Sequence, residues 1–256
     1  MEALKKRPVI EVEDASISFD NFKAVKNVTT SIYENEIRFL IGPNGAGKTT
    51  LLDAICGKNK LSGGKITYHN EAKGYDLSKV KEHKIVELGV GRKFQAPSIF
   101  NGITIMENME LAVASSKNLI SSIFAPITAD EKDRIKDALQ FVGLYEYRNE
   151  LPTILSHGQK QWLEISMICV LRPKLMLLDE PVAGMGRRET EKTAELLRII
   201  QKDCAIIVVE HDMKFVKEVS TSVTVLHEGS VLCEGSMDVI QNNQQVIDVY
   251  FGRGGE

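Results

Sequence analysis

The sequence has few cysteines, and they are widely separated. Its four cysteines, Cys56, Cys169, Cys204 and Cys233, include no C-x-x-C pair, and none has a histidine at ligand spacing. This pattern argues against a metal site and against a disulfide framework. We therefore expect buried thiols in a reducing compartment.

Long apolar segments are also missing. No run approaches the roughly 18–20 apolar residues that a membrane-spanning helix needs. The residues Met1 to Arg7 lead into Glu11 and Glu13 without the apolar core of a signal peptide. We expect a chain that by itself neither crosses a membrane nor is exported through one.

The chain carries no strong charge of either sign. Its 32 Lys and Arg against 35 Asp and Glu leave a net charge of −3, which gives no electrostatic footprint for nucleic acid. With 256 residues, 43% of them hydrophobic, it can bury a sizeable core as one large domain or two small ones. No internal repeat, low-complexity tract or long linker interrupts it.

A glycine-rich loop, Gly42 to Thr49, reads G-P-N-G-A-G-K-T and fits the pattern G-x-x-x-x-G-K-[ST]. The apolar run Ile37 to Ile41 precedes it and the helical run Thr50 to Ile55 follows, as a phosphate-binding loop requires. Such a loop turns backbone N–H groups toward phosphate oxygens, Lys48 adds a mobile charge, and the Thr49 hydroxyl can ligate magnesium. The predicted nucleotide-binding residues here are Gly42, Pro43, Asn44, Gly45, Ala46, Gly47, Lys48, Thr49 and Thr50.

Two continuous apolar runs, Leu175 to Leu178 and Ala205 to Val209, are separated by the helical stretch Arg187 to Gln201. Such runs are typical of strands that are covered on both faces of a parallel sheet. Polar residues follow each run, at the strand ends where parallel sheets bind ligands.

Three of these polar residues are candidates for chemistry. Asp179 can hold magnesium directly or through water, and Glu180 can orient and deprotonate an attacking water. The alternative for this pair is a charged turn before Pro181. His211 follows the second run, where contact with a γ-phosphate is favoured over a purely structural role.

The segment Ser156-His157-Gly158-Gln159 has the capping-box pattern S-x-x-Q and opens a predicted helix from Lys160 to Leu171. The hydroxyl of Ser156, the neighbouring N–H groups and the helix dipole would form a second anion site. We predict Ser156, Gly158 and Gln159 as its binding residues.

Periodicity predicts the remaining elements. Residues 8–40 alternate apolar and polar positions, which indicates an antiparallel strand group, and Gly63-Gly64 opens a further strand at 65–68. The pattern from Ile103 to Val142 is helical; it contains a capping box at Thr128 to Glu131 and ends at Gly143.

The motifs at Gly42 to Thr49, Gln95, Leu155 to Gln159, Leu175 to Glu180 and His211 occur in the order and approximate spacing of ABC-type ATPases. The resemblance covers nearly the whole chain. It implies an α/β P-loop NTPase fold: a mainly parallel core sheet, an N-terminal antiparallel strand group and an inserted α-helical subdomain. The implied domains are a nucleotide-binding core at 1–95 and 156–256 and a helical subdomain at 96–155.

The same resemblance implies an ATPase that uses ATP and Mg²⁺. It adds Gln95 to the catalytic residues Glu180 and His211. It also adds Gln95 to the metal ligands Thr49 and Asp179. An aromatic residue that stacks on adenine is expected at Phe19, although Phe22 competes and either could belong to the core. The second anion site would serve ATP bound to the phosphate loop of a partner subunit, so that ATP joins two subunits and hydrolysis releases them.

Four segments point to one branch of the ABC-type ATPases by their sequence. They are Leu155 to Ile165, Asp179 to Met185, Val208 to Met213 and Val225 to Leu232. These segments are similar to those of an ATP-binding subunit of bacterial urea importers, a branch of the branched-chain amino acid transporter group. The implied partners are a second, non-identical ATP-binding subunit, two membrane permease subunits and an extracytoplasmic solute-binding protein, without nucleic acid. The implied location is peripheral, at the cytoplasmic face of the inner membrane. Both a monomer and an ATP-dependent dimer are compatible with the isolated chain.

Other readings stay open at this point. The solute could be a branched-chain amino acid or another small molecule, and residues alone do not identify it. A soluble ABC ATPase acting on DNA or ribosomes is disfavoured, because the segment between the loop and Ser156 lacks sustained heptads and the chain has one ATPase unit. A catalytically inactive nucleotide sensor would have lost Lys48 or Glu180.

Two positions depart from the common family pattern. His157 stands where glycine is usual, and we expect its side chain to point outward from the capping turn. Gly186 stands near the position of an aspartate that couples the two sites, which leaves that coupling in doubt.

Apolar residues after Gln95 either line a groove that receives a permease helix or form a local core. These residues are Ile99, Phe100, Ile103, Ile105, Met106, Leu119, Ile120, Ile123 and Phe124.

Overall fold

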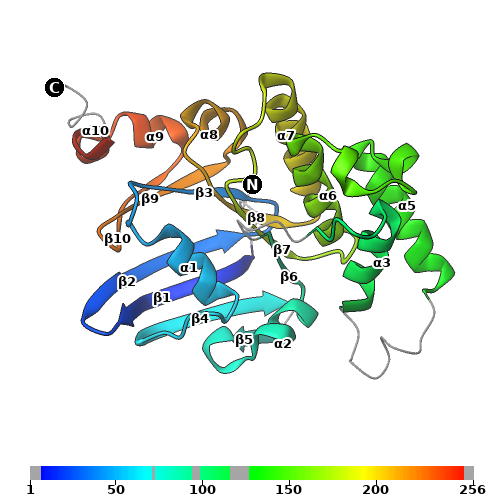
Figure 1. Cartoon of the computed structure of the whole chain (residues 1–256). Coiled ribbons are helices and arrows are strands. Elements are labelled where there is room, and N and C mark those ends of the chain that lie inside the picture. Colours follow the sequence, from blue (N-terminus) through cyan, green and yellow to red (C-terminus); the bar gives the residue numbers. More distant parts are fainter. Residues whose placement is uncertain (1–6, 71–72, 94–98, 116–126, 251–256) are drawn as a thin grey trace, which may run out of the picture.

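The computed structural model describes residues 7–70, 73–93, 99–115 and 127–250, which form two sheets and a set of helices (Figure 1). The first sheet is antiparallel, with strand order β2-β1-β4-β5. Its strands are β1 (Pro8–Phe19), β2 (Phe22–Tyr33), β4 (Gly63–Asn70) and β5 (Lys73–Asp76). The alternating pattern correctly predicted antiparallel strands in this part of the chain; Pro8 pairs with Tyr33 and Phe19 with Phe22.

The second sheet has six strands in the order β10-β9-β3-β8-β7-β6. Its strands are β3 (Ile37–Ile41), β6 (Val90–Lys93), β7 (Leu175–Asp179), β8 (Ala205–Val209), β9 (Ser222–His227) and β10 (Ser230–Gly235). All neighbouring pairs are parallel except β9 and β10. Every residue of β3, β7 and β8 is buried, which confirms the prediction for the last two strands.

The predicted antiparallel group at 8–40 was too long, because Ile37–Ile41 belongs to the parallel sheet. Arg38 makes this short strand look alternating in the sequence, yet its guanidinium is buried. Its Nε donates to Glu36 Oε1 at 2.6 Å, and one terminal nitrogen donates to Thr224 Oγ1 at 2.9 Å and contacts Glu234. These partners allow a charged residue inside a buried strand.

Two of the helices begin at the predicted caps. They are α1 (Lys48–Ile55), α2 (Glu82–Glu87), α3 (Ile105–Ser115), α5 (Ala129–Val142), α6 (His157–Cys169), α7 (Arg187–Ile200), α8 (Met213–Val219), α9 (Met237–Gln241) and α10 (Gln244–Tyr250). Capping boxes are present at Thr128 and at Ser156, and Gly143 ends α5 in the left-handed region. Helix α6 starts at His157 and not at the predicted Lys160, because Ser156 is itself the cap.

Helix α6 packs against two different cores. Trp162 and Leu163 join an apolar cluster with residues of α3 and α5, whereas Ile165 and Ile168 join the cluster beneath the six-stranded sheet. Figure 1 shows α3 and α5 on the side of the core away from β1 and β2. The division into a core and a helical subdomain at 96–155 stays a prediction. Among the described residues, no helix is long and apolar enough to span a bilayer.

The apolar residues after Gln95 separate into different environments. Ile105 is fully buried in the helix cluster, so it belongs to the local core and cannot line a surface groove. Phe100 is exposed, and Ile99, Ile103 and Met106 are half-buried. The other residues of this prediction, at 119–124, lie outside the described part of the chain.

Candidate functional site

The sheet order brings the predicted functional segments to one edge. Strands β3, β8 and β7 are parallel neighbours, so their carboxyl ends lie side by side. The loop Gly42 to Thr49 follows β3, His211 follows β8, and Glu180 follows β7. Three segments that are far apart in the sequence therefore meet at the edge where parallel sheets bind ligands.

The loop needs glycine at two positions because backbone passes very close. At Gly42, with φ of 153°, a Cβ atom would lie 2.1 Å from the Leu226 carbonyl oxygen, and at Gly47, with φ of 99°, it would lie 2.6 Å from the Ala24 carbonyl oxygen. Gly47 is also the N-cap of α1 and provides no side-chain cap. The first-turn N–H groups of α1 are thus suited to bind an anion.

Lys48 is buried, and the loop itself holds its ammonium group. Its Nζ donates to the carbonyl oxygens of Gly42, at 2.7 Å, and Pro43, at 3.0 Å. Burial lowers the pKa of Lys48, and the nearby carboxylates of Glu180 and Asp179 oppose this shift. The charge therefore lies beside the turn that would bind phosphates.

Asp179 lies at the buried end of β7 and is hydrogen-bonded to the Thr49 side chain. Burial raises the pKa of Asp179, while the Thr49 bond and the positive charge of Arg92 lower it. Its Oδ1 is buried without a hydrogen-bond partner among the described residues. A hydroxyl beside a carboxylate with an unsatisfied oxygen fits the oxygen ligands that Mg²⁺ prefers.

Glu180 and His211 face one another across the same edge. His211 Nε2 lies 3.0 Å from Glu180 Oε1, and both side chains are partly exposed. The backbone of Glu180 has φ of 49°, and its N–H donates to the Val209 carbonyl oxygen at 2.9 Å. A non-glycine residue in the left-handed region is a strained conformation that recurs at functional sites.

A cavity of about 330 Å³ joins these groups. It is lined by Phe19, Phe22, Ala24, Asn44, Gly45, Ala46, Gly47, Lys48, Thr49, Thr50, Glu180, Val209 and His211. Phe19 is 48% exposed and Phe22 is 65% exposed, so neither belongs to the core. Both aromatic rings line the cavity, and both stay candidates for stacking on adenine. Gln95 lies outside the described residues.

The predicted second anion site lies apart from this cavity. Ser156 Oγ accepts a hydrogen bond from the Gln159 N–H at 3.2 Å, and Gln159 Oε1 accepts one from the Ser156 N–H at 2.9 Å. Of the residues that line the cavity, none comes from 156–159. The two predicted phosphate-binding arrangements therefore occupy separate places on the chain.

His157 is exposed, as expected, but it also makes a specific contact. Its Nε2 lies 2.9 Å from the carbonyl oxygen of Ala183, in the loop that follows Glu180. The departure from glycine at this position thus links the start of α6 to that loop.

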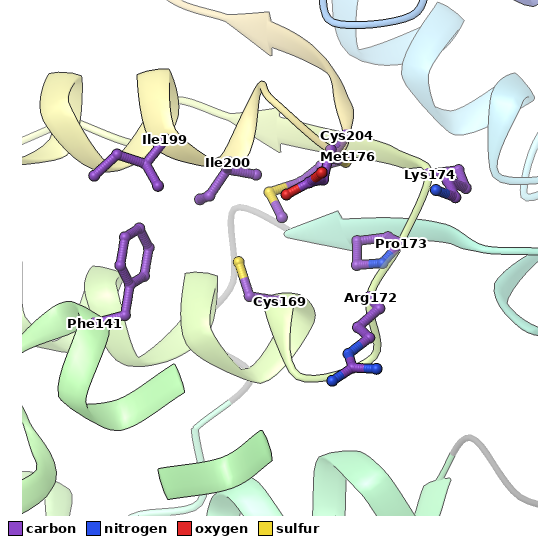
Figure 2. Close-up of a pocket in the computed structure, with 10 residues that line it drawn as sticks. Phe141, Cys169, Arg172, Pro173, Lys174, Met176, Ile199, Ile200 and Cys204 are labelled. Atoms are coloured by element: carbon purple, nitrogen blue, oxygen red, sulfur yellow. The ribbon is translucent and has the colours of Figure 1, made fainter. Parts of the chain in front are cut away.

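A second cavity, of about 450 Å³, lies at the other end of β7 from Asp179. Figure 2 shows Phe141 and Cys169 projecting from the helices on one side toward Ile199 and Ile200 on the other. Burial raises the pKa of Cys169 to about 12, so this thiol is not a nucleophile near neutral pH. No predicted site residue lines this cavity.

Sequence reasoning missed Glu210, which joins the segment after Glu180 to the segment that carries His211. This buried carboxylate accepts the Val182 N–H at Oε1 and the His211 N–H at Oε2, both at 3.0 Å. Burial raises the pKa of Glu210, and the backbone N–H bonds oppose the shift. A charged residue directly after the buried strand β8 was the signal that could have revealed it.

Replacing Glu210 by glutamine should weaken the site without changing its volume. An amide presents one acceptor where the carboxylate presents two, so either Val182 or His211 would have an unsatisfied N–H. We expect the free energy of unfolding to fall by about 1–3 kcal/mol, and ATPase activity to fall with it. Denaturant unfolding measures the first effect. The same change at the exposed Glu218, which pairs with Arg198, is the control and should be close to neutral; equal effects of the two changes would contradict this role.

The chain is similar in sequence to known proteins. The family model described as ABC transporter matches residues 25–183. The high-affinity branched-chain amino acid transport ATP-binding protein LivG of Salmonella typhimurium is 34% identical over 257 residues, covering 96% of this chain and 98% of LivG. The corresponding protein BraF of Pseudomonas aeruginosa is 32% identical, with the same coverage.

Solved structures share the fold. An ATP-binding cassette of an ABC transporter in its ADP conformation superposes with a TM-score of 0.85 at 24% identity, covering 96% of this chain and 99% of that one. A nucleotide-free cassette from an ABC transporter gives a TM-score of 0.82 at 23% identity, covering 96% and 100%. The two-sheet architecture and its helices are therefore those of such cassettes.

Proposed function

Since the chain belongs to the ABC transporter family, as an ATPase of the branched-chain amino acid transporter group, we propose that it powers import of a small solute through separate permease subunits. The observation that carries this proposal is the convergence of the phosphate loop, Asp179, Glu180 and His211 at one edge of the sheet. A binding module without hydrolysis would not need a carboxylate and an imidazole aimed at the same cavity.

In this proposal the loop N–H groups and Lys48 hold the phosphates of ATP, and Phe19 or Phe22 packs on the base. Mg²⁺, held by Thr49, Asp179 and Gln95, would neutralise phosphate charge when bound. Glu180 accepts a proton from water as the water oxygen bonds to the γ-phosphorus and the bond to the ADP oxygen breaks. His211, 3.0 Å from Glu180, is placed to orient that carboxylate or to contact the γ-phosphate. The products are ADP and phosphate.

The second phosphate-binding arrangement, at Ser156, Gly158 and Gln159, would complete the site of an ATP bound by another ATPase subunit. Its separation from the cavity supports this assignment, because residues 156–159 do not line the cavity formed by the loop of the same chain. ATP binding would then close the pair, and hydrolysis would open it. The proposed partner is a second, non-identical ATP-binding subunit.

Two solutes have support of different kinds. The names of LivG and BraF support branched-chain amino acids. The wording around Ser156 to Ile165 and Val225 to Leu232 resembles urea importers and supports urea. The further proposed partners are two membrane permease subunits, contacted by the helical subdomain at 96–155, and an extracytoplasmic solute-binding protein. The chain would then sit peripherally at the cytoplasmic face of the membrane.

Reconstitution tests this proposal directly. The chain would be purified with the membrane and ATPase chains that accompany it, and vesicles would be assayed for ATP-dependent uptake of labelled urea and labelled leucine. Uptake of one solute identifies the substrate. Co-purification with no permease, or ATP hydrolysis without uptake of either solute, would refute the corresponding part of the proposal.

Replacing Ser156 by arginine should distinguish the roles of the two phosphate-binding arrangements. We expect the ATPase activity of the assembled complex to fall about a hundredfold, as on loss of one transition-state donor, while the isolated chain keeps its ATP affinity. Equilibrium binding and steady-state hydrolysis measure the two effects. Ser236 is the exposed N-cap of α9 and provides the matched control. A comparable loss of ATP affinity in the isolated Ser156 variant would show that the serine serves its own nucleotide.

A further inference from the structure

A carboxylate of the same chain lies against the second phosphate-binding arrangement. Ser156 Oγ donates a hydrogen bond to Glu189 Oε1 at 2.8 Å. The contact with Gly158 is so close that a Cβ atom there would lie 2.4 Å from Glu189 Oε1. Glu189 is in the first turn of α7, 33 residues further along the chain, so only the packing of α6 beside α7 brings it here.

Glu189 is held at this position by a second bond. Its Oε2 accepts the N–H of Gly186, the N-cap residue of α7, at 3.1 Å. Beside it, His157 contacts the Ala183 carbonyl. The start of α6 is therefore tied to the loop 183–186, which follows Glu180, by two contacts within one subunit.

The chemistry of this contact conflicts with phosphate binding. A serine hydroxyl has a single hydrogen to donate, and in this structure the hydrogen goes to Glu189. A γ-phosphate would require the same hydrogen and the same positive end of the 13-residue helix α6. Because carboxylate and phosphate are both negative, the two cannot share the site without repulsion.

We propose that Glu189 is a built-in anion that occupies the second phosphate-binding arrangement of this chain until the γ-phosphate of the partner's ATP displaces it. This inference rests on the proposed function, because it assumes that Ser156 serves a nucleotide on another subunit. On displacement Glu189 keeps its bond to Gly186, while Ser156 is released from α7. The arrival of the partner's ATP thereby separates the start of α6 from α7, whose N-cap residue Gly186 ends the loop after Glu180.

The charge of Glu189, and not its shape, is the quantity to test. Glu189→Gln keeps an acceptor for Ser156 or Gly186 and removes the negative charge. The matched control is Glu191→Gln on the same helix, whose carboxylate pairs with Arg187 at 2.8 Å, whereas Ser156 bonds to Glu189. Trp162 provides a folding check, because it is the only tryptophan and its Nε1 donates to Thr193 Oγ1 across the interface of α6 and α7. Its fluorescence in the isolated chain should be the same in both variants.

The measurement is the ATP concentration that gives half-maximal closure of the ATPase pair, in the Glu180→Gln background that stops turnover. Glu189→Gln should lower this concentration by about two- to fivefold relative to Glu191→Gln, as expected for removal of a partly exposed like charge. The difference should shrink as ionic strength rises, which a purely structural role would not produce.

An ATP requirement that is equal to or higher than that of the control would overturn the inference, because Glu189 would then support the site and not compete for it. If the pair with native Glu189 fails to close at any ATP concentration, the proposed function fails together with the inference.

Discussion

Replacing Glu180 by glutamine is expected to lower the rate of ATP hydrolysis by about a hundred- to ten-thousandfold, the range for loss of a general base. The amide keeps the size and the contact with His211, but it cannot accept a proton from water. ATP affinity should remain, because Lys48 and the loop N–H groups are unchanged. Steady-state hydrolysis and equilibrium binding on the same preparation separate the two effects.

Glu228 offers a matched control for this substitution. It also directly follows a strand of the six-stranded sheet and also has a left-handed backbone, with φ of 47°, but it does not line the nucleotide cavity. Glu228→Gln should hydrolyse ATP at the native rate. Normal turnover by Glu180→Gln would show that another group is the base.

Removing the ammonium group of Lys48 is expected to have the second largest effect. Lys48→Ala deletes a buried positive charge that lies within the loop, and it leaves the carbonyl oxygens of Gly42 and Pro43 without their donor. We expect ATP affinity to fall about a hundredfold, as on truncation of a buried charged partner in a complex. Fluorescence or calorimetric titration with ATP measures this change.

Lys58→Ala tests whether the loss is specific. Lys58 follows α1 and its side chain is 54% exposed, 3.7 Å from Asp53. A surface pair of this kind contributes little, so ATP affinity should remain native. If Lys48→Ala binds ATP as tightly as Lys58→Ala, the loop does not hold phosphate in the manner described.

The sequence predicted the parts of the fold that depend on local patterns. The strand Ala205–Val209 is a continuous apolar run, and the caps at Thr128 and Ser156 depend on residues three positions apart. Each of these signals is contained in a few consecutive residues. The strand Ile37–Ile41 was assigned to the wrong group because Arg38 imitates alternation, and its partners Thr224 and Glu234 are distant in the chain.

Some residues of the candidate site were also predictable from local patterns, and others depend on tertiary packing. Motif spacing indicated the loop residues, Asp179, Glu180 and His211, and the parallel order of β3, β8 and β7 brings them to one edge. A charged residue directly after β8 indicates the position of Glu210 in the sequence. The bonds that Glu210 and Glu189 make do not follow from the sequence, because they depend on how β8 meets the loop after β7 and on how α6 packs beside α7. Charged residues at strand and helix ends have many exposed positions available, and only tertiary packing places Glu210 in a buried position and Glu189 in a partly exposed one.

In the proposed pair, the Ser156 segment of a second ATPase subunit completes the ATP site at the loop Gly42 to Thr49. Sedimentation of the Glu180→Gln chain with the ATPase subunit that co-purifies with it tests this most directly. The account predicts a stable pair with ATP and separate subunits with ADP, and loss of the pair when Ser156 is replaced by arginine. ATP binding without any change in sedimentation, or a pair that forms equally well with ADP, would contradict it.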